Sequence, residues 1–254
     1  MCIRDRPNVK NFSWMTVVAA MGQMFYSLSI AMGILITFGS YMKKETSLED
    51  STRNVEVFDT AIAIMAGLMI IPAVFSFSGG DPDTLQAGPA LMFITIPKVF
   101  ENMGFGTVVG ILFFLLVLFA AVTSSIALTE SAVSTFEDEL GWSRRRATVL
   151  VGVIMIALGS LSSLGYGPLA GIKIIGMQFL DFFDFLTNSV MMPIAAMLTS
   201  LFVSRIVGMK RMEEEIMHGE STFRRKKIFI VMIKYLCPVF ALIILISSVA
   251  NAFG

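Results

Sequence analysis

The chain has 254 residues, of which 56% are hydrophobic and 15% are charged, and its 19 basic residues balance its 19 acidic residues. Soluble domains carry roughly 25% charged residues, so this composition excludes an ordinary soluble enzyme, a disordered protein and a disulfide scaffold. The zero net charge gives no indication of a nucleic-acid partner. Because the apolar residues lie in blocks that approach or exceed the ~20 residues of a membrane span, the sequence predicts an all-α polytopic membrane protein.

Six apolar blocks are predicted to form six transmembrane helices. The first block has 31 residues, and at 1.5 Å per residue it would extend over ~46 Å, more than the ~30 Å hydrocarbon core. It must therefore tilt, protrude or break, and Ser27, Ser29 and Gly33 suggest a break, although a continuous helix with a seam of small residues is the alternative. The six blocks cover residues 12–42, 58–77, 105–136, 147–164, 172–207 and 228–250.

Basic residues set the expected orientation of these helices. They concentrate in the connections that follow the first, third and fifth blocks, and the positive-inside rule places those connections in the cytoplasm. The first helix then runs from outside to inside although no signal peptide precedes it, which suggests that helices of a longer parent chain come before it. The basic residues are Lys43, Lys44, Arg53, Arg144, Arg145, Arg146, Lys210, Arg211, Arg224, Arg225, Lys226 and Lys227.

The outer connection over residues 78–104 is long. It contains an amphipathic stretch, Leu91–Phe100, after a Gly-Gly-Asp-Pro sequence. The stretch predicts either a re-entrant or surface-lying cap, or a plain loop.

Polar residues inside the apolar blocks mark candidate sites, because such residues are costly in a membrane and usually functional. Ala120, Thr123 and Ser124 stand at positions i, i+3 and i+4, so their oxygen atoms would share one helix face. Hard cations prefer such oxygen ligands. The alternative is that the hydroxyls bond to carbonyls of the preceding turn or hold helices together. The other polar positions are Gln23, Ser27, Ser29, Asp59, Ser125, Glu130, Asp181 and Asp184.

Catalytic readings find little support in the sequence. The buried serines have no histidine near them, and His218 lies in a charged stretch. Cys2 and Cys237 are too far apart for a metal or redox motif. We therefore expect no enzymatic activity.

Three segments strongly resemble the neurotransmitter:sodium symporter family. They are Gly22–Gly33, similar to the family's sixth helix, and Leu118–Ala127 and Glu137–Arg144. The resemblance covers about residues 11–254 and is greatest to the bacterial branch with eleven helices. It implies the second half of a five-plus-five inverted-repeat fold, the leucine-transporter-like arrangement.

The resemblance also implies a domain organisation. The opening Met-Cys-Ile-Arg-Asp-Arg does not fit the sequence that follows, and residues 1–10 are interpreted as a non-native or chimeric leader. Residues 11–208 would form the second inverted repeat, helices six to ten, with the outer cap loop 78–104. Residues 209–227 would form a cytoplasmic loop and residues 228–254 helix eleven.

Site residues are implied position by position. Ala120, Thr123 and Ser124 match the family's second sodium site, and Ser27 matches a ligand of the first. Asp59 falls where the family usually has Asn as a first-sodium ligand. The amino-acid pocket would include Tyr26, Ser29, Met32, Ser125 and Leu128. Asp184 would belong to the outer gate, and Asp138 and Tyr41 to the inner gate.

The function implied is sodium-coupled symport of a neutral amino acid across the plasma membrane by alternating access. Met32 and Leu128 favour an apolar or aromatic substrate. Asp59, with Gln23 on the facing helix, would replace the chloride that animal members use, unless Asp59 merely caps its helix. We expect two sodium ions to bind at two sites. The other expected partners are the amino-acid substrate, membrane lipid and a missing N-terminal repeat of the same protein. The alternative is a non-transporting membrane subunit or receptor that keeps the fold.

Overall fold

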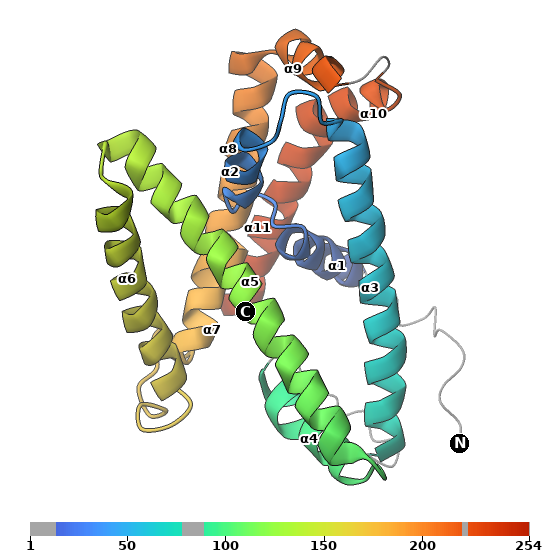
Figure 1. The fold of residues 1–254 in the computed structure, drawn as a ribbon, viewed down its shortest axis with the longest axis vertical. Helices are drawn as coiled ribbons and strands as arrows, with labels where there is room; N and C mark the ends of the chain where they lie inside the picture. Colours follow the sequence, from blue (N-terminus) through green and yellow to red (C-terminus); the bar gives the residue numbers. More distant parts are fainter. Residues whose placement is uncertain (1–13, 78–88, 220–222, 254) are drawn as a thin grey trace. The chain divides into compact units, whose positions relative to one another are not determined.

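The structure is a computed structural model that describes residues 14–77, 89–219 and 223–253 (Figure 1). The predicted leader 1–10 and residues 78–88 of the predicted cap loop lie outside these ranges. The described part is nearly all helical, with an isolated β-bridge between Ile174 and Met177. Contacts divide it into two compact units, residues 55–126 and residues 13–54 with 127–254. The predicted all-α fold is confirmed.

The first apolar block is a broken helix. Helix α1 covers Trp14–Ser27 and helix α2 covers Ile34–Ser40. Between them the backbone takes left-handed conformations, with φ of 54° at Ser29, 64° at Ala31 and 79° at Gly33. Residues other than glycine rarely adopt positive φ, so the segment is strained and cannot continue the helix. Of the predicted ways to fit this block into a bilayer, the structure shows the break.

Five other helical stretches are long and apolar enough to cross a membrane among the described residues, so the predicted six helices become five continuous spans and one broken helix. Three are single helices: α3 (Leu48–Phe77), α5 (Gly106–Leu140) and α6 (Arg144–Leu164). The fourth stretch, Phe179–Val207, consists of α7 (Phe179–Asp184), η4 (Phe185–Met191), α8 (Met192–Phe202) and η5 (Val203–Val207).

The remaining span and the connections complete the element order. The fifth span begins at Lys226 and consists of α10 (Lys226–Val231), η7 (Met232–Leu236) and α11 (Cys237–Phe253). The amphipathic stretch predicted as a cap or a loop is helical, as η3 (Leu91–Thr95) and α4 (Ile96–Glu101). The connection before the last span contains α9 (Met209–Ile216) and η6 (Met217–Gly219).

Two predicted helix starts are wrong. Helix α3 begins at Leu48, ten residues before the predicted Phe58, because its first turns are polar and hydropathy does not reveal them. The Ser47 hydroxyl accepts a hydrogen bond from the Asp50 main-chain N–H at 3.0 Å, which caps the helix. The fifth block was expected to start near Ile172, yet its helix starts at Phe179.

Prolines explain three of the four π-helical segments among the described residues; the fourth, η5, is followed by Gly208 instead. Segments η3, η4 and η7 are π-helical, and each ends two residues before a proline: Pro97, Pro193 and Pro238. Proline lacks the N–H that an α-helix needs and its ring clashes with the carbonyl one turn earlier, which a local π-turn relieves. These three widened turns therefore follow from the sequence.

A carbonyl in one widened turn is paired by a neighbouring helix. The buried Ser200 hydroxyl of α8 donates to the Ile233 carbonyl of η7 at 2.5 Å. Five residues after Ile233 stands Pro238, which has no N–H to offer in a π-type bond. Serine hydroxyls commonly satisfy main-chain groups that a proline frees in membrane helices. This contact holds η7 against α8.

Helices α5 and α6 form a hairpin with its own small core. Val133 of α5 packs with Ala147 and Val151 of α6, all buried. At the turn, Gly141 has φ 62°, and the Phe136 and Trp142 rings stack with centroids 5.6 Å apart. The turn therefore packs the first turns of α6 against the last turns of α5.

Gly33 is required at the break by its neighbour as well as by its dihedral angle. A Cβ atom there would lie 2.6 Å from the Ser131 Oγ of α5, so the buried Ser131 side chain would have to move. Gly39, in α2, has nothing within 4 Å of the same position. The two glycines are therefore a matched pair for mutation.

We expect Gly33→Ala to lower the thermal unfolding midpoint of the purified protein in detergent, since an L-residue at this φ costs about 1–2 kcal/mol before the clash is counted. Gly39→Ala should be neutral or slightly stabilising. Adding Ser131→Ala to Gly33→Ala should recover part of the loss. Equal midpoints for the Gly33→Ala and Gly39→Ala variants would contradict this account of the break.

Candidate functional site

A polar cavity of about 390 Å³ lies between α1, the junction of α7 with η4, and α11. Three of the residues predicted from the sequence, Gln23, Tyr26 and Asp184, line it together. The Asn188 side-chain amide donates to Asp184 Oδ1 at 2.5 Å. The rest of its lining is Val18, Ala19, Gly22, Ser189, Ile244, Ser247 and Ser248. The structure therefore joins the first and fifth blocks around one acidic side chain.

The break supplies the second part of the candidate site. Ser27 is the last residue of α1, and Ser29 and Met32 lie within the non-helical segment. The Ile30 N–H donates to the Phe25 carbonyl at 2.9 Å, so the first turn after α1 is widened. An interrupted helix leaves main-chain donors and acceptors without their regular partners, and these groups suit the charged ends of a small molecule.

The hydroxyl cluster lies on α5. The Thr123 hydroxyl is within hydrogen-bond distance of the Phe119 carbonyl at 3.1 Å and the Ala120 carbonyl at 3.0 Å, and the Ser125 hydroxyl donates to Val122 at 2.9 Å. This is the bonding to preceding carbonyls that the sequence left open as an alternative. A hydroxyl that donates its hydrogen keeps lone pairs for another partner, so the bonds do not decide between packing and ion binding.

Position along the helices settles one alternative for Asp59. It is the twelfth residue of α3, so at 1.5 Å per residue it lies ~16 Å from the helix start. Ser47 is the capping residue. The alternative that Asp59 caps this helix is therefore wrong.

Leu128 is placed by the same geometry on α5. It follows Ser124 by four residues, so the two share a helix face with Ala120. Its side chain is exposed, as are those of Thr123 and Ser124.

Glu130 accepts hydrogen bonds from two elements. Its Oε1 accepts a hydrogen bond from the Tyr41 hydroxyl at 2.7 Å, and its Oε2 accepts one from the Arg144 guanidinium at 2.5 Å. Arg144 also donates to Glu137 Oε2 at 3.2 Å. Arg144 belongs to this chain, and the turn at Gly141 returns it to α5. Asp138, the other predicted inner-gate residue, lies in the last turn of α5.

Small hydroxyl residues join α2 to the second half of α5, and the sequence analysis missed them. The buried Thr37 hydroxyl lies 3.3 Å from the Ser134 hydroxyl. The buried Ser131 faces the Met32 carbonyl at 3.5 Å. Thr37 follows Gly33 by four residues and precedes Tyr41 by four, so the spacing was available as a signal of one helix face.

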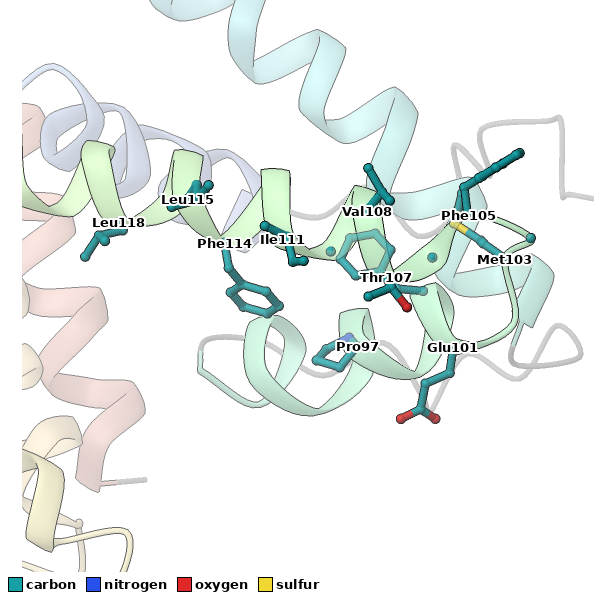
Figure 2. Close-up of a pocket in the computed structure, with 14 residues that line it drawn as sticks. Pro97, Glu101, Met103, Phe105, Thr107, Val108, Ile111, Phe114, Leu115 and Leu118 are labelled. Atoms are coloured by element: carbon teal, nitrogen blue, oxygen red, sulfur yellow. The ribbon is translucent and has the colours of Figure 1, made fainter.

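A second cavity, of about 780 Å³, separates α4 from the first half of α5 (Figure 2). Its lining is mainly apolar, with Pro97 from α4 and Ile111, Phe114 and Leu118 from α5, and in Figure 2 the Glu101 carboxylate points away from α5. None of the predicted site residues lines it. We assign it to the packing of the helical cap rather than to the candidate site.

Known proteins with similar sequences identify the family to which this chain is related. The sequence profile of the sodium:neurotransmitter symporter family matches residues 6–253. An uncharacterized sodium-dependent transporter of Bacillus subtilis is 32% identical, with 81% of this chain and 45% of that protein covered. One of Haemophilus influenzae is 31% identical, with 96% and 52% covered. The chain thus spans about half the length of these relatives.

A solved structure shows the same fold. The crystal structure of MhsT in complex with L-phenylalanine superposes with a TM-score of 0.81 at 36% identity, covering 91% of this chain and 51% of that one. The family is one of transporters and not of enzymes, and its members cross the plasma membrane several times, as the apolar helices here require. The chain belongs to the sodium:neurotransmitter symporter family.

Proposed function

We propose that the full-length protein containing this chain carries a neutral amino acid inward together with sodium, by alternating access. The observation that carries the proposal is the break at residues 28–33 within an apolar block, in a chain of this family. Transporters built from inverted repeats place substrate and ions at discontinuous helices near the bilayer midplane. The cavity that contains Gln23, Tyr26 and Asp184 would be the outer part of the substrate path.

The proposed substrate has an apolar or aromatic side chain. MhsT was solved with L-phenylalanine bound, which supports an amino acid. Of the pocket residues implied by the family resemblance, Met32 and Leu128 are apolar, whereas Tyr26, Ser29 and Ser125 carry hydroxyls. Main-chain groups at the break would take the substrate's charged ends, and the apolar pair would contact its side chain.

Two sodium ions are proposed to drive transport. Ala120, Thr123 and Ser124 would hold one, and Ser27 and Asp59 would contribute to the other. Coupling follows if sodium binds the outward-facing state more tightly than the inward-facing one, since a ligand shifts an equilibrium only by its differential affinity.

Reconstitution tests the proposal. The full-length protein in liposomes should accumulate labelled phenylalanine or leucine when an inward sodium gradient is imposed, and should not when potassium replaces sodium. Binding of the amino acid without uptake would favour the alternative of a receptor or non-transporting subunit. Absence of both binding and uptake would reject the proposal.

The double substitution Thr123→Val with Ser124→Ala should raise the sodium concentration for half-maximal uptake at least tenfold. Each lost oxygen is expected to cost about 1–3 kcal/mol, by analogy with an unmade buried hydrogen bond. Ser162→Ala is the control, because Ser162 of α6 has a similar hydroxyl bond to Leu158 one turn earlier. Unchanged sodium dependence in the double variant would leave the cluster with a packing role only.

Transport should not need chloride. A carboxylate at Asp59 would stand near the first sodium, where an opposite charge at ~4 Å contributes several kcal/mol at an effective dielectric constant near 20. Uptake by the unmutated protein should persist when gluconate replaces chloride, and Asp59→Asn should make uptake depend on chloride. Loss of uptake in gluconate by the unmutated protein would refute this prediction.

Removing the Glu130 charge should shift the transporter toward its inward-facing state. Glu130 holds Tyr41 and Arg144 together, and these residues fall at the proposed inner gate. Glu130→Gln should therefore lower sodium affinity and increase cytoplasmic labelling of a cysteine introduced beside the gate. Glu137→Gln is the control, since Glu137 contacts Arg144 without holding Tyr41. Equal effects of the two substitutions would show that the Tyr41 contact is irrelevant to gating.

A further inference from the structure

Two adjacent arginines and three apolar residues form a groove on α6. The groove has a volume of about 410 Å³ and is lined by Arg145, Arg146, Val149, Leu150 and Val153. Residues 145, 149 and 153 follow one another at intervals of four, so they form a single stripe along the helix. The stripe has two basic groups at one end and an apolar floor over the next ~12 Å.

This stripe faces away from the rest of its hairpin. Ala147 and Val151 of α6 are buried against Val133 of α5. At 3.6 residues per turn, Arg145 and Val149 lie roughly opposite Ala147 around the helix. Val149 and Val153 are accordingly 60% and 59% exposed. The groove is therefore a separate surface from the one that packs α6 on α5.

The two arginines have no acidic partner in the part of the chain that the structure describes. Arg144, the residue before them, is engaged by Glu130 and Glu137. Each residue of an α-helix turns by ~100°, so Arg145 and Arg146 point away from those carboxylates. Two guanidinium groups are thus left to bind an anion, and guanidinium pairs well with phosphate oxygens.

The chemistry of the groove requires an amphiphile. Its apolar floor belongs to a membrane-spanning helix, so a soluble anion or an acidic peptide would match the arginines but leave the floor uncovered. The positive-inside rule places this end of α6 at the cytoplasmic face, where membranes expose anionic headgroups and basic residues attract them. A phospholipid presents a phosphate and an acyl chain in the order that the stripe requires.

We propose that this groove binds an anionic phospholipid of the cytoplasmic leaflet, with the lipid phosphate on Arg145 and Arg146 and an acyl chain along Val149, Leu150 and Val153. The proposal does not depend on transport activity. It makes α6 a lipid-binding element whose other face organises the α5–α6 hairpin.

Native mass spectrometry of the purified full-length protein in detergent tests the proposal with phosphatidylglycerol, phosphatidylethanolamine and glycerol 3-phosphate as probes. Phosphatidylglycerol should bind saturably and more tightly than the other two. Arg145→Gln with Arg146→Gln should weaken its binding about 30-fold, the effect of two basic residues near a charged surface. Arg145→Lys with Arg146→Lys should keep most of the affinity, because the charges remain.

The matched control is Lys43→Gln with Lys44→Gln, which removes two adjacent basic residues from a connection on the same side of the membrane and should leave lipid affinity unchanged. Thermal unfolding midpoints establish that each variant is folded. If the glutamine pair is not, the single variants Arg145→Gln and Arg146→Gln are compared with the control, and each should bind phosphatidylglycerol more weakly than the control does. Equal phosphatidylglycerol affinity in the glutamine pair and the control would overturn the proposal. Equal binding of glycerol 3-phosphate, or burial of the groove in a lipid-independent dimer, would also overturn it.

Discussion

The constraint on which this structure depends is that main-chain N–H and C=O groups in a hydrocarbon environment must find partners within the protein. A regular α-helix pairs these groups within itself, so each break or widened turn needs another way to pair them. At η4 and η7 the reason for the widened turn is a proline two residues later, and the Ser200 hydroxyl pairs the Ile233 carbonyl. At residues 28–33 there is no proline, and the break instead relies on left-handed dihedral angles and on the close approach of Ser131 to Gly33.

The second constraint is helical geometry at the α5–α6 turn, where three consecutive arginines face different surroundings. Arg144 returns to Glu130 and Glu137, whereas Arg145 and Arg146 have no acidic partner among the described residues. A basic run of this kind is usually read only as a topology signal. Here one charge closes a contact between α5, α6 and the end of α2, and the other two line an outward-facing groove.

Hydropathy predicted the bounds of α5 within four residues at either end, because its apolar run is long and uninterrupted. The same signal failed for α3, whose first ten residues are mainly polar and begin after the Ser47 cap. The broken first helix could be suspected from its length, but positive φ at Ser29 and Ala31 could not, because residues other than glycine rarely adopt it. The Glu130–Arg144 pair could not be predicted either, because the two residues meet only after the turn at Gly141 folds α6 back along α5.

Helix α5 links the proposed sodium ligands to the proposed inner gate. Glu130 follows Thr123 by seven residues, close to two full turns, so the two lie ~10 Å apart on nearly the same face. The helix is continuous from Gly106 to Leu140, without a proline or a π-turn between them. An ion bound at Thr123 would therefore act on a continuous helix that also carries the acceptor of Tyr41 and Arg144. If the proposed function holds, sodium binding and closure of the cytoplasmic end are coupled through the orientation of one helix rather than through a chain of separate side-chain movements.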